Sequence, residues 1–370
     1  MKFTCEKNAL VSAVSVASRT VAQKSTIPAL EGIYIRAGVK LTLSGYNLET
    51  GITISVDAEI QQTGACIMPS RLFFDIIRKL PGDTVSISVD EKFKVSIRGG
   101  ISSFSITAMS SEDYPELPEV ESDKGISLPQ NELKAMIGGT SFAVSENQAR
   151  PIHTGCLFEV EDSSITVVAV DGYRLALRRW KSEEPIGRTL KFVVPAAALK
   201  EAEKILGDTD DPCTFFLGSK HILFTIGEAT LVCRLLEGEF LDWRRVLPQN
   251  QPVKLAVNVA KMTDSIERVG LIISEKLKSP VRCKFGENTA DFRSVSTIGE
   301  AHDVCQIAGD GQDMEIGFNC RYLLDALRAI PDAECSLELI NGLSPIVMNP
   351  CDGSERYSYM VLPVRLKAGE

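Results

Sequence analysis

The chain has 370 residues, 44% hydrophobic and 24% charged, which is the composition of an ordinary folded protein rather than a disordered or fibrous one. No apolar run approaches the roughly 18 residues of a membrane-spanning helix, and the stretch Met1 to Glu6 lacks the apolar segment of a secretion signal, so a cytoplasmic protein is expected. The net charge of −9 argues against a uniformly basic surface but does not exclude nucleic acid, because the distribution of charge matters more than its sum.

The first part of the chain alternates strand and helix patterns. Residues 2–6 predict a strand, and residues 8–21 predict a helix, because apolar residues recur at helical spacing from Leu10 to Val21. Alternating apolar and polar residues predict further strands at 32–36, 40–44, 52–56, 85–89, 94–97 and 104–106. A second helix is predicted at 70–80, and the acidic, proline-containing stretch 110–121 indicates a linker.

The rest of the chain follows the same plan. Helices are expected at 131–142, 196–206, 259–274 and 319–330, the last with Asn319 as its N-cap. Strands are expected at 155–160, 164–170, 174–180, 213–217, 221–226, 230–236 and 359–366. Asp171 and Gly172 stand between two of these strands and predict a two-residue hairpin turn, and the polar stretch 247–252 indicates another linker.

One helical pattern occurs three times, about 125 residues apart. The apolar face consists of Phe73, Ile77 and Leu80, then of Ala198, Ala202 and Ile205, and then of Leu323, Leu327 and Ile330. Stop signals built from Pro, Gly and Asp follow each copy. The repeat predicts three similar units, at 1–122, 123–250 and 251–370. Helices with one apolar face must lie on a sheet, and strands joined by short turns run antiparallel, so each unit is expected to be α+β.

Cysteine and histidine give no sign of a metal site. Ten cysteines are scattered from Cys5 to Cys351 with no C-x-x-C pair, which indicates buried free thiols rather than a disulfide framework. His153, His221 and His302 lack ligand-type spacing. No metal and no cofactor are therefore expected.

Positive charge is concentrated on the predicted helices. These six segments, with the first taken from residue 6, carry 12 basic and 8 acidic residues, whereas the remainder carries 28 basic and 41 acidic residues. One interpretation is that Lys and Arg simply occupy solvated helix faces, where they are good helix formers. The other is a surface that contacts phosphates without reading bases.

The chain contains no recognisable catalytic motif. The patterns G-x-x-x-x-G-K-S/T, H-E-x-x-H and G-x-S-x-G are absent, and no G-x-G-x-x-G follows a strand. Asp171 could serve as a catalytic carboxylate, but its position before Gly172 favours a turn role. The acidic group Glu237, Glu239 and Asp242 fits solvated loop charge, so no catalytic residue is expected.

Three motifs resemble one family, the β subunit of bacterial DNA polymerase III, or beta sliding clamp. They are Val170–Ala176 (VDGYRLA, usually TDGHRLA in the family), Glu239–Pro248 (EFLDWRRVLP, usually containing FPDYRRVLP) and the ending Met360–Leu366 (MVLPVRL). The three repeated α+β units fit the same family, so the resemblance covers the whole chain.

The resemblance implies a non-catalytic DNA polymerase processivity factor. Two chains would join head to tail into a ring of six similar domains, with antiparallel sheets outside and helices lining the central hole. Duplex DNA would pass through that hole and be held by topology rather than by sequence. The implied partners are double-stranded DNA, a second copy of the chain, the alpha subunit of DNA polymerase III, the clamp loader and other proteins that carry a clamp-binding motif.

The resemblance also implies a partner-peptide groove between the second and third domains. Its expected residues are His153, Val170, Gly172, Tyr173, Arg174, Leu175, Leu241, Arg245, Val246, Leu277, Asn319, Tyr322, Leu343, Pro345, Met360, Val361, Leu362, Pro363, Val364 and Arg365. Apolar walls of this kind hold apolar anchors of a peptide, while a few polar groups fix its backbone. Tyr173 replaces the usual His, Leu241 the usual Pro and Leu277 a frequent Phe.

Two further surfaces follow from the resemblance. The expected phosphate contacts are Lys24, Arg71, Arg78, Lys79, Lys134, Arg150, Lys200, Lys204 and Arg321. Ring closure is expected to pair the strand around Phe104 and Ile106 with the segment around Leu271 and Ile272. Two alternatives remain: an enzyme with an unrecognised site, which would need a carboxylate cluster or an activated nucleophile, and a repeat adaptor that binds only proteins.

Overall fold

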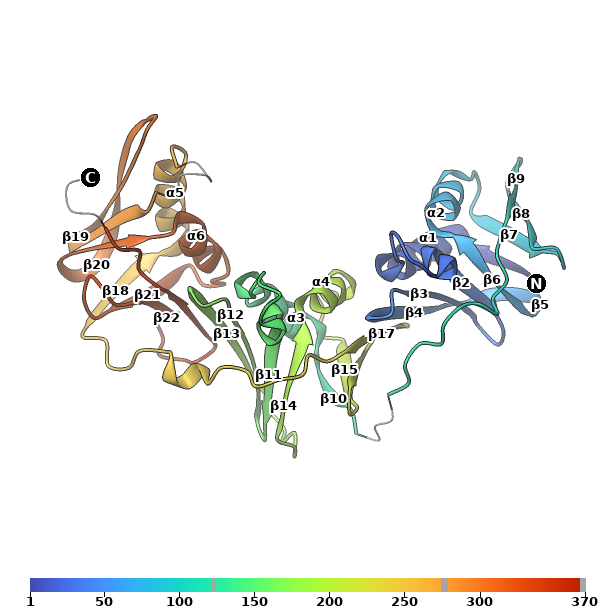
Figure 1. The fold of residues 1–370 in the computed structure, drawn as a ribbon, viewed down its shortest axis with the longest axis horizontal. Coiled ribbons are helices and arrows are strands. Elements are labelled where there is room, and N and C mark those ends of the chain that lie inside the picture. The colour runs from blue at the N-terminus through green and yellow to red at the C-terminus, as the bar shows by residue number, and fades with distance from the viewer. Residues whose placement is uncertain (121–123, 274–278, 367–370) are drawn as a thin grey trace. The chain divides into compact units, whose positions relative to one another are not determined.

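The computed structural model describes residues 1–120, 124–273 and 279–366. These residues form two compact units, which we describe separately. Unit 1 comprises Met1–Lys134 and Ala197–Leu235, and unit 2 comprises Ala135–Ala196 and Leu236–Glu370. The α-helices in the described ranges are α1 (Lys7–Ala17), α2 (Ser70–Lys79), α3 (Gln130–Gly138), α4 (Ala196–Ile205), α5 (Val259–Gly270) and α6 (Cys320–Arg328) (Figure 1).

Unit 1 contains two antiparallel sheets. The strands are β1 (Lys2–Glu6), β2 (Gly32–Ala37), β3 (Leu41–Tyr46), β4 (Thr50–Val56), β5 (Ala58–Gln62), β6 (Gly64–Pro69), β7 (Thr84–Val89), β8 (Lys94–Gly99), β9 (Ser102–Thr107), β10 (Ile126–Pro129), β15 (Pro212–Leu217), β16 (His221–Ile226) and β17 (Ala229–Arg234). The smaller sheet has the order β5-β1-β7-β8-β9, and the larger has β10-β15-β16-β17-β4-β3-β2-β6. Helices α1 and α2 pack together, and α1 also contacts β3 and β4. The core between sheets and helices includes Phe3, Leu10, Phe73 and Ile97.

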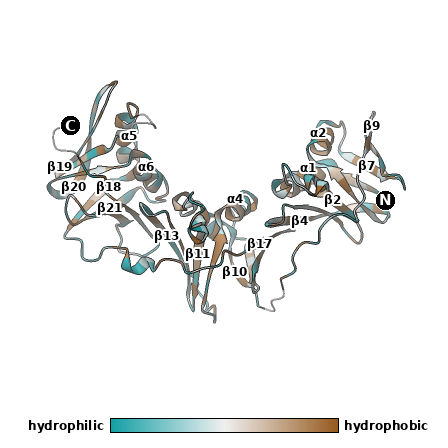
Figure 2. Cartoon of the chain, viewed as in Figure 1, coloured by the Kyte–Doolittle hydropathy of each residue, from teal (hydrophilic) through white to brown (hydrophobic). Residues whose placement is uncertain are grey.

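Unit 2 contains one ten-stranded antiparallel sheet. Its strands are β11 (Gly155–Glu161), β12 (Ser164–Val170), β13 (Arg174–Lys181), β14 (Leu190–Pro195), β18 (Val253–Asn258), β19 (Val281–Ser296), β20 (Gly299–Phe318), β21 (Glu334–Leu339), β22 (Ile346–Pro350) and β23 (Tyr357–Val361). The order is β14-β11-β12-β13-β23-β22-β21-β18-β20-β19. Strands β11 and β12 are almost wholly buried and strongly apolar (Figure 2). Helix α5 packs on α6 and on the β19–β20 pair.

The central segment of the chain, residues 123–250, is divided between the two units because its strands pair with strands of both neighbouring segments. Strand β17 pairs with β4 of the first segment, in the register Ala229↔Ile54 to Cys233↔Thr50. Strand β13 pairs with β23 of the last segment, in the register Arg174↔Val361 to Arg178↔Tyr357. Each half of the central segment therefore completes a sheet with a neighbouring segment.

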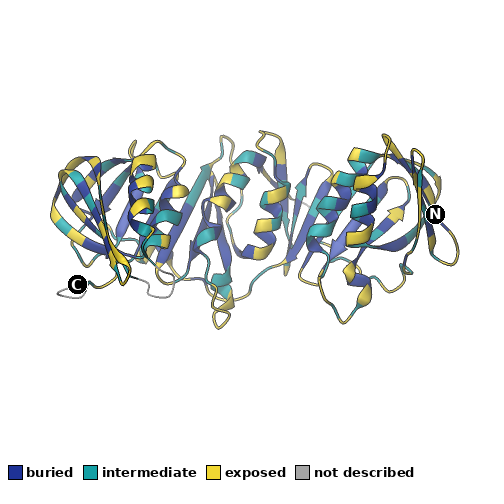
Figure 3. Ribbon diagram, turned by 90° about the horizontal axis from the view of Figure 1, so that it is seen from above, coloured by how far each residue is buried: buried dark blue, intermediate teal, exposed yellow. Residues whose placement is uncertain are grey.

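The α+β prediction and all six predicted helices are confirmed, together with most of their apolar faces. Each helix in Figure 3 has a buried side and an exposed side. Asn319 caps α6 as predicted, because its Oδ1 accepts a hydrogen bond from the Tyr322 backbone N–H at 3.2 Å. The repeated face is buried at eight of its nine positions; in α4, Ile205 is half-buried and Leu206 is buried in its place.

Four predicted ends differ from the observed ones by four residues or more. The helix expected to reach Val21 ends as an α-helix at Ala17 and continues as a 3-10 turn, Ser18–Thr20. The helices expected to reach residues 142 and 274 end at Gly138 and Gly270, because glycine is a poor helix former. The last strand ends at Val361 rather than 366, since Pro363 cannot donate a ladder hydrogen bond.

Several strands were not predicted. Strands β5, β6, β10, β14, β18, β21 and β22 and the long β19–β20 pair are present in addition to the strand ranges predicted. The hairpin between β12 and β13 has three residues between its strands, Asp171 to Tyr173, rather than the predicted two. No helix within the described residues is both long and apolar enough to cross a bilayer.

Candidate functional site

Arg174, at the start of β13, joins four elements of unit 2 through its guanidinium. Its Nε donates to Asp171 Oδ2 at 2.9 Å, and its two terminal nitrogens donate to Asp325 Oδ2 and the Phe142 carbonyl oxygen, each at 2.6 Å. The Arg174 residue is only 8% exposed. A buried guanidinium needs such partners, because an unpaired charge is costly away from water. Arg174 thus holds the β12–β13 turn, α6 and the short helix Ser141–Ala143 together.

Aromatic rings stack on the same guanidinium. The Arg174 guanidinium carbon lies 4.4 Å from the Tyr322 ring centroid and 5.3 Å from that of Phe142. The Tyr173 and Tyr322 rings are stacked with centroids 6.1 Å apart. Tyr173 is 61% exposed, so it forms the solvent-facing end of this arrangement. We call the arrangement of Tyr173, Tyr322, Phe142 and the Arg174 guanidinium the Tyr173 stack. The stack presents a flat, preformed aromatic surface to solvent.

The β12–β13 turn positions the Tyr173 stack. Gly172 has a φ of +92°, a conformation that side chains with a Cβ rarely adopt. Asp171 Oδ1 accepts hydrogen bonds from the backbone N–H groups of Tyr173 and Arg174 at 2.9 and 3.0 Å. The predicted turn role of Asp171 is confirmed, and its other oxygen is engaged by Arg174.

An apolar cluster lies beside the turn, on the face of β13 opposite to the Arg174 side chain. Five of the expected groove residues belong to it: Val170, Leu175, Val246, Met360 and Leu362. Strand pairing explains their proximity, because Leu175 lies opposite Met360 and the Leu362 N–H donates to the Tyr173 carbonyl oxygen at 2.8 Å. Phe240 and Trp243 pack in the same cluster and were not among the predicted residues.

His153 packs against this cluster through Phe240. The two rings meet edge to face with centroids 4.9 Å apart. His153 Nδ1 is buried and has no hydrogen-bond partner within the described ranges. Burial lowers the pKa of His153 below its ordinary value, and the nearby Arg150 charge lowers it further. Both effects favour the neutral form of the His153 ring.

Glu159 anchors the segment that carries Trp243. Its carboxylate is buried and accepts hydrogen bonds from Trp243 Nε1 at 3.1 Å and from Arg244 at 2.8 Å, and Lys191 Nζ lies 3.2 Å away. Burial alone would raise the pKa of Glu159, but these donors outweigh it and the pKa lies below its ordinary value. The acidic group that precedes this segment is exposed, as expected for solvated loop charge, and Asp242 pairs with Arg245 at 3.0 Å.

The remaining expected groove residues lie outside the apolar cluster. Val361 pairs with Arg174, while Leu241, Leu343 and Val364 are 43%, 81% and 39% exposed. Outside the cluster as well are Arg245, Pro345, Pro363 and Arg365. Leu277 lies outside the described residues. The structure thus gathers the motif residues of β12, β13 and β23 and leaves several apolar side chains of unit 2 open to solvent.

The expected phosphate contacts lie mostly on exposed helix faces. In unit 1, Arg71, Arg78 and Lys79 project from α2, and Lys24 lines a shallow hollow with Gln23 and Glu49. Three of these cations have carboxylate partners: Arg78 with Asp75 at 3.5 Å, Lys134 with Asp208 at 2.8 Å and Lys204 with Glu201 at 2.7 Å. In unit 2, Arg321 lies 3.9 Å from Asp325. The exposed cations Arg71, Lys79, Arg150 and Lys200 have no such partner among the residues described.

The residues expected to close a ring are exposed or half-buried. Strand β9 is the edge strand of the five-stranded sheet, and Phe104 on it is 41% exposed. Leu271, just after α5, is 82% exposed, and Ile272 and Ile106 are half-buried. An edge strand with apolar side chains is a template for pairing with another chain.

No metal-ligating group of His, Cys, Asp and Glu occurs within the described ranges. All ten cysteines are free thiols, and eight of them are buried as predicted. Cys320 is half-buried and Cys351 is exposed, so the prediction of burial is wrong for these two.

Comparison with known proteins gives one family along the whole chain. Family models match residues 1–118 (DNA polymerase III beta subunit, N-terminal domain), 127–242 (the central domain) and 244–365 (the C-terminal domain). Curated proteins named "Beta sliding clamp" from Staphylococcus epidermidis and Staphylococcus aureus are each 32% identical, over 381 and 378 residues, and 99% of each chain is covered. A DNA polymerase sliding clamp structure from Bacillus subtilis matches with a TM-score of 0.94 at 30% identity, covering 99% of this chain and 100% of that one. A structure described as a putative DNA polymerase III beta subunit from Eubacterium rectale matches with a TM-score of 0.93 at 32% identity, covering 98% and 99%.

Proposed function

This chain belongs to the family of DNA polymerase III beta subunits, and from that premise we propose that two copies form a ring that encircles duplex DNA and slides along it. As a member of the sliding clamps it is a non-catalytic processivity factor for a DNA-directed DNA polymerase. The observation that carries the proposal is the succession of three family matches, in order, over residues 1–365. We assign the domains to residues 1–122, 123–250 and 251–370.

The helices of this protein would face the DNA. The excess of basic over acidic residues on the helices supports this assignment, because phosphate contacts are electrostatic and need no base readout. The residues proposed to contact phosphate are Lys24, Arg71, Arg78, Lys79, Lys134, Arg150, Lys200, Lys204 and Arg321. Unpaired, exposed cations such as Lys79 and Lys200 would contribute more to the affinity for DNA phosphates than cations already paired with a carboxylate.

The ring would close by pairing of edge segments. Strand β9 of one protomer, with Phe104 and Ile106, would meet the segment Leu271–Ile272 of the partner. The exposure of Phe104 and Leu271 supports this, since apolar side chains are costly to leave in water and are covered in a head-to-tail contact.

The Tyr173 stack and the apolar cluster would bind short linear peptide motifs. A peptide with apolar anchors would bury them against Val170, Leu175 and Met360, and a flat side chain would lie on Tyr173. The proposed partners are the alpha subunit of DNA polymerase III, the clamp loader and other proteins with such motifs. We propose a cytoplasmic location, where the replication machinery works, and no cofactor.

The decisive experiment measures retention on DNA after loading by the matching clamp loader and ATP. A nicked circle is compared with the same molecule cut to a linear form. Retention on the circle with loss from the linear DNA is expected, because a topological link fails only where DNA has an end.

Two other results would contradict the proposal. Equal retention on both forms would mean ordinary binding rather than encirclement. No retention on either, with loading verified by a known clamp, would favour an adaptor that binds only proteins.

A further inference from the structure

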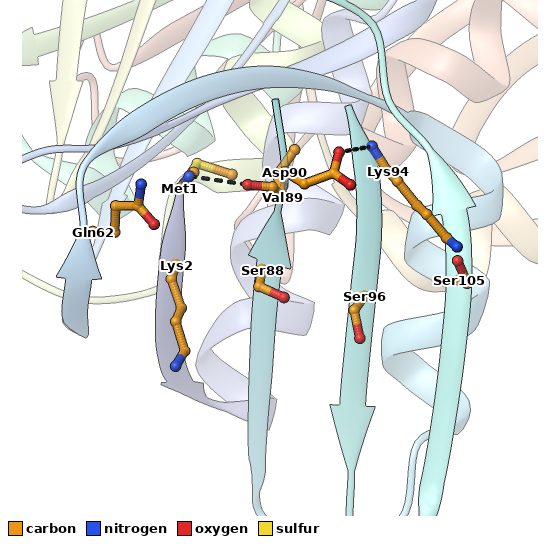
Figure 4. A pocket seen from close by; sticks show the side chains of 9 residues that line it. All are labelled: Met1, Lys2, Gln62, Ser88, Val89, Asp90, Lys94, Ser96 and Ser105. Carbon is orange, nitrogen blue, oxygen red and sulfur yellow. Dashed lines mark hydrogen bonds between the residues drawn. The ribbon is translucent and has the colours of Figure 1, made fainter. Parts of the chain in front are cut away.

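A hollow of about 530 Å³ lies on one face of the five-stranded sheet of unit 1 (Figure 4). Lys2, Ser88, Ser96 and Ser105 line it, one from each of β1, β7, β8 and β9. This face is the outer one, because the alternate residues of the same strands, such as Ile87, are buried in the core. The hollow is separate from the Tyr173 stack, which belongs to unit 2.

The lining residues form one cross-strand row. Lys2 lies opposite Ser88, Ser88 opposite Ser96, and Ser96 opposite Ser105. Neighbouring strands are about 4.8 Å apart, so the row spans roughly 14 Å. Figure 4 shows the Lys2 side chain at one end of this row, and Lys94, which also lines the hollow, stands on β8 two residues before Ser96 and on the same face. The serine hydroxyls thus share this face with two lysine side chains.

These polar groups have unused hydrogen-bonding capacity. Within the part of the chain that the structure describes, Ser88, Ser96 and Ser105 make no side-chain hydrogen bond, and neither lysine has a carboxylate within 4 Å. The adjacent row differs, because the Thr4 and Ser86 hydroxyls bond each other at 3.0 Å. These hydroxyl and ammonium groups are therefore available to donate hydrogen bonds to a ligand in the hollow.

Asp90 is the single carboxylate that lines the hollow. Its Oδ1 accepts hydrogen bonds from the backbone N–H groups of Lys92 and Lys94, both at 2.9 Å, so it is engaged in its own turn. Three ammonium groups, those of Lys2, Lys94 and the Met1 N-terminus, against one engaged carboxylate leave the hollow positive. This balance favours an anion over a cation.

We propose that this hollow binds a linear oligophosphate lying across the strands from Lys2 to Lys94. The cations at the two ends would pair with charges on the chain, and the serine hydroxyls would donate to oxygens between them. A phosphate chain has oxygens along its whole length, so its binding does not depend on matching one fixed spacing of ligand groups to the spacing of the strands. An extended acidic peptide instead presents same-face carboxylates about 6.7 Å apart, which does not match the 4.8 Å strand spacing.

The proposed site is compatible with ring closure. Side chains alternate along β9, so Ser105 faces the hollow while Phe104 and Ile106 point to the opposite face. Oligophosphate binding and pairing of the β9 edge therefore use different faces of the strand.

Titration calorimetry on the whole protein at low ionic strength tests the proposal. The probes are sodium tripolyphosphate, orthophosphate and hexaglutamate. Tripolyphosphate is expected to bind most tightly, because it carries more charge than orthophosphate and because its closely spaced oxygens, unlike the carboxylates of hexaglutamate, do not have to match the strand spacing. Lys2→Gln and Lys94→Gln should each weaken it by about two- to fivefold, the range for an exposed ion pair.

Two control variants define the site. Lys92→Gln removes an exposed lysine from the same turn that does not line the hollow, and Lys220→Gln removes an exposed lysine elsewhere in unit 1; neither should change the affinity. The proposal is overturned if Lys2→Gln and Lys94→Gln bind tripolyphosphate like the unchanged protein. It is also overturned if orthophosphate or hexaglutamate binds at least as tightly as tripolyphosphate.

Discussion

The guanidinium of Arg174 on β13 lies 2.6 Å from Asp325 Oδ2 on α6, an ion pair that links residues 151 positions apart. The buried Arg174 guanidinium thus pairs with two carboxylates, those of Asp325 and Asp171. This contact decides how the β12–β13 turn is held against α6, and the exposed Tyr173 ring depends on that turn.

Arg174→Ala should destabilise unit 2 by about 3 kcal/mol, because removing one member of a buried ion pair leaves its partners uncompensated. Denaturant unfolding followed by tryptophan fluorescence would measure it, since Trp243 lies in this unit. Arg321→Ala is the matched control: Arg321 is exposed and 3.9 Å from the same Asp325, so its loss should cost below about 1 kcal/mol. Equal effects of the two variants would show that Arg174 has no special structural role.

Tyr173→Ala should weaken binding of a clamp-binding peptide about tenfold, because the outer ring of the stack is removed while Tyr322 and Arg174 remain. Tyr173→Phe should bind almost normally, since stacking needs only the ring. Fluorescence anisotropy with a labelled peptide from the polymerase subunit would measure both. Unchanged affinity in Tyr173→Ala would place the peptide elsewhere.

Phe104→Asp and Ile272→Asp should each convert the proposed dimer to monomers at nanomolar concentration, because a charge would be buried in an apolar contact. Sedimentation velocity with fluorescence detection would report the state. Val39→Asp is the control, because Val39 is fully exposed between β2 and β3 and takes no part in the proposed contact. If the dimer survives both interface changes, the assigned edges are not the ones that pair.

Stability should fall as the pH drops below about 6.5, partly because of His153. Its pKa is lowered in the folded protein by burial and by Arg150, so the unfolded chain binds the proton first. The contribution of the neutral His153 ring to the free energy of unfolding is complete above the pKa of the unfolded chain, and it decreases as the pH falls from there through the pKa of the folded protein. Urea unfolding at several pH values between 7.5 and 5 should show a shallower loss in His153→Gln. A loss of the same steepness in both proteins would assign the pH dependence to other groups.

Much of the fold follows from spacing along the chain. Phe73, Ile77 and Leu80 are buried as their helical period requires, and Asn319 caps the helix that its sequence position suggests. The β19–β20 pair escaped prediction because its alternation is interrupted. Its register shifts between Phe285 and Thr289, and Asn288 adopts a positive φ.

The candidate site was predictable only in part. Val170, Leu175 and Met360 were named from motifs, and the structure brings them into one cluster. Phe142 and Asp325 were missed, because their contacts with Arg174 join residues 32 and 151 positions apart and no local pattern marks them. Long-range pairing is set by the tertiary fold, and a single sequence carries no local signal for it.

The two shared sheets have a consequence for how the chain can be divided. If residues 123–250 were made alone, β17 would lose β4 and β13 would lose β23, so two strands that are paired on both sides in the whole chain would become open edges. Such edges recruit other chains, and the isolated fragment should aggregate rather than fold. A gene encoding this protein can therefore not be shortened by one repeat without also rebuilding a sheet edge, although the three repeats resemble one another in sequence pattern.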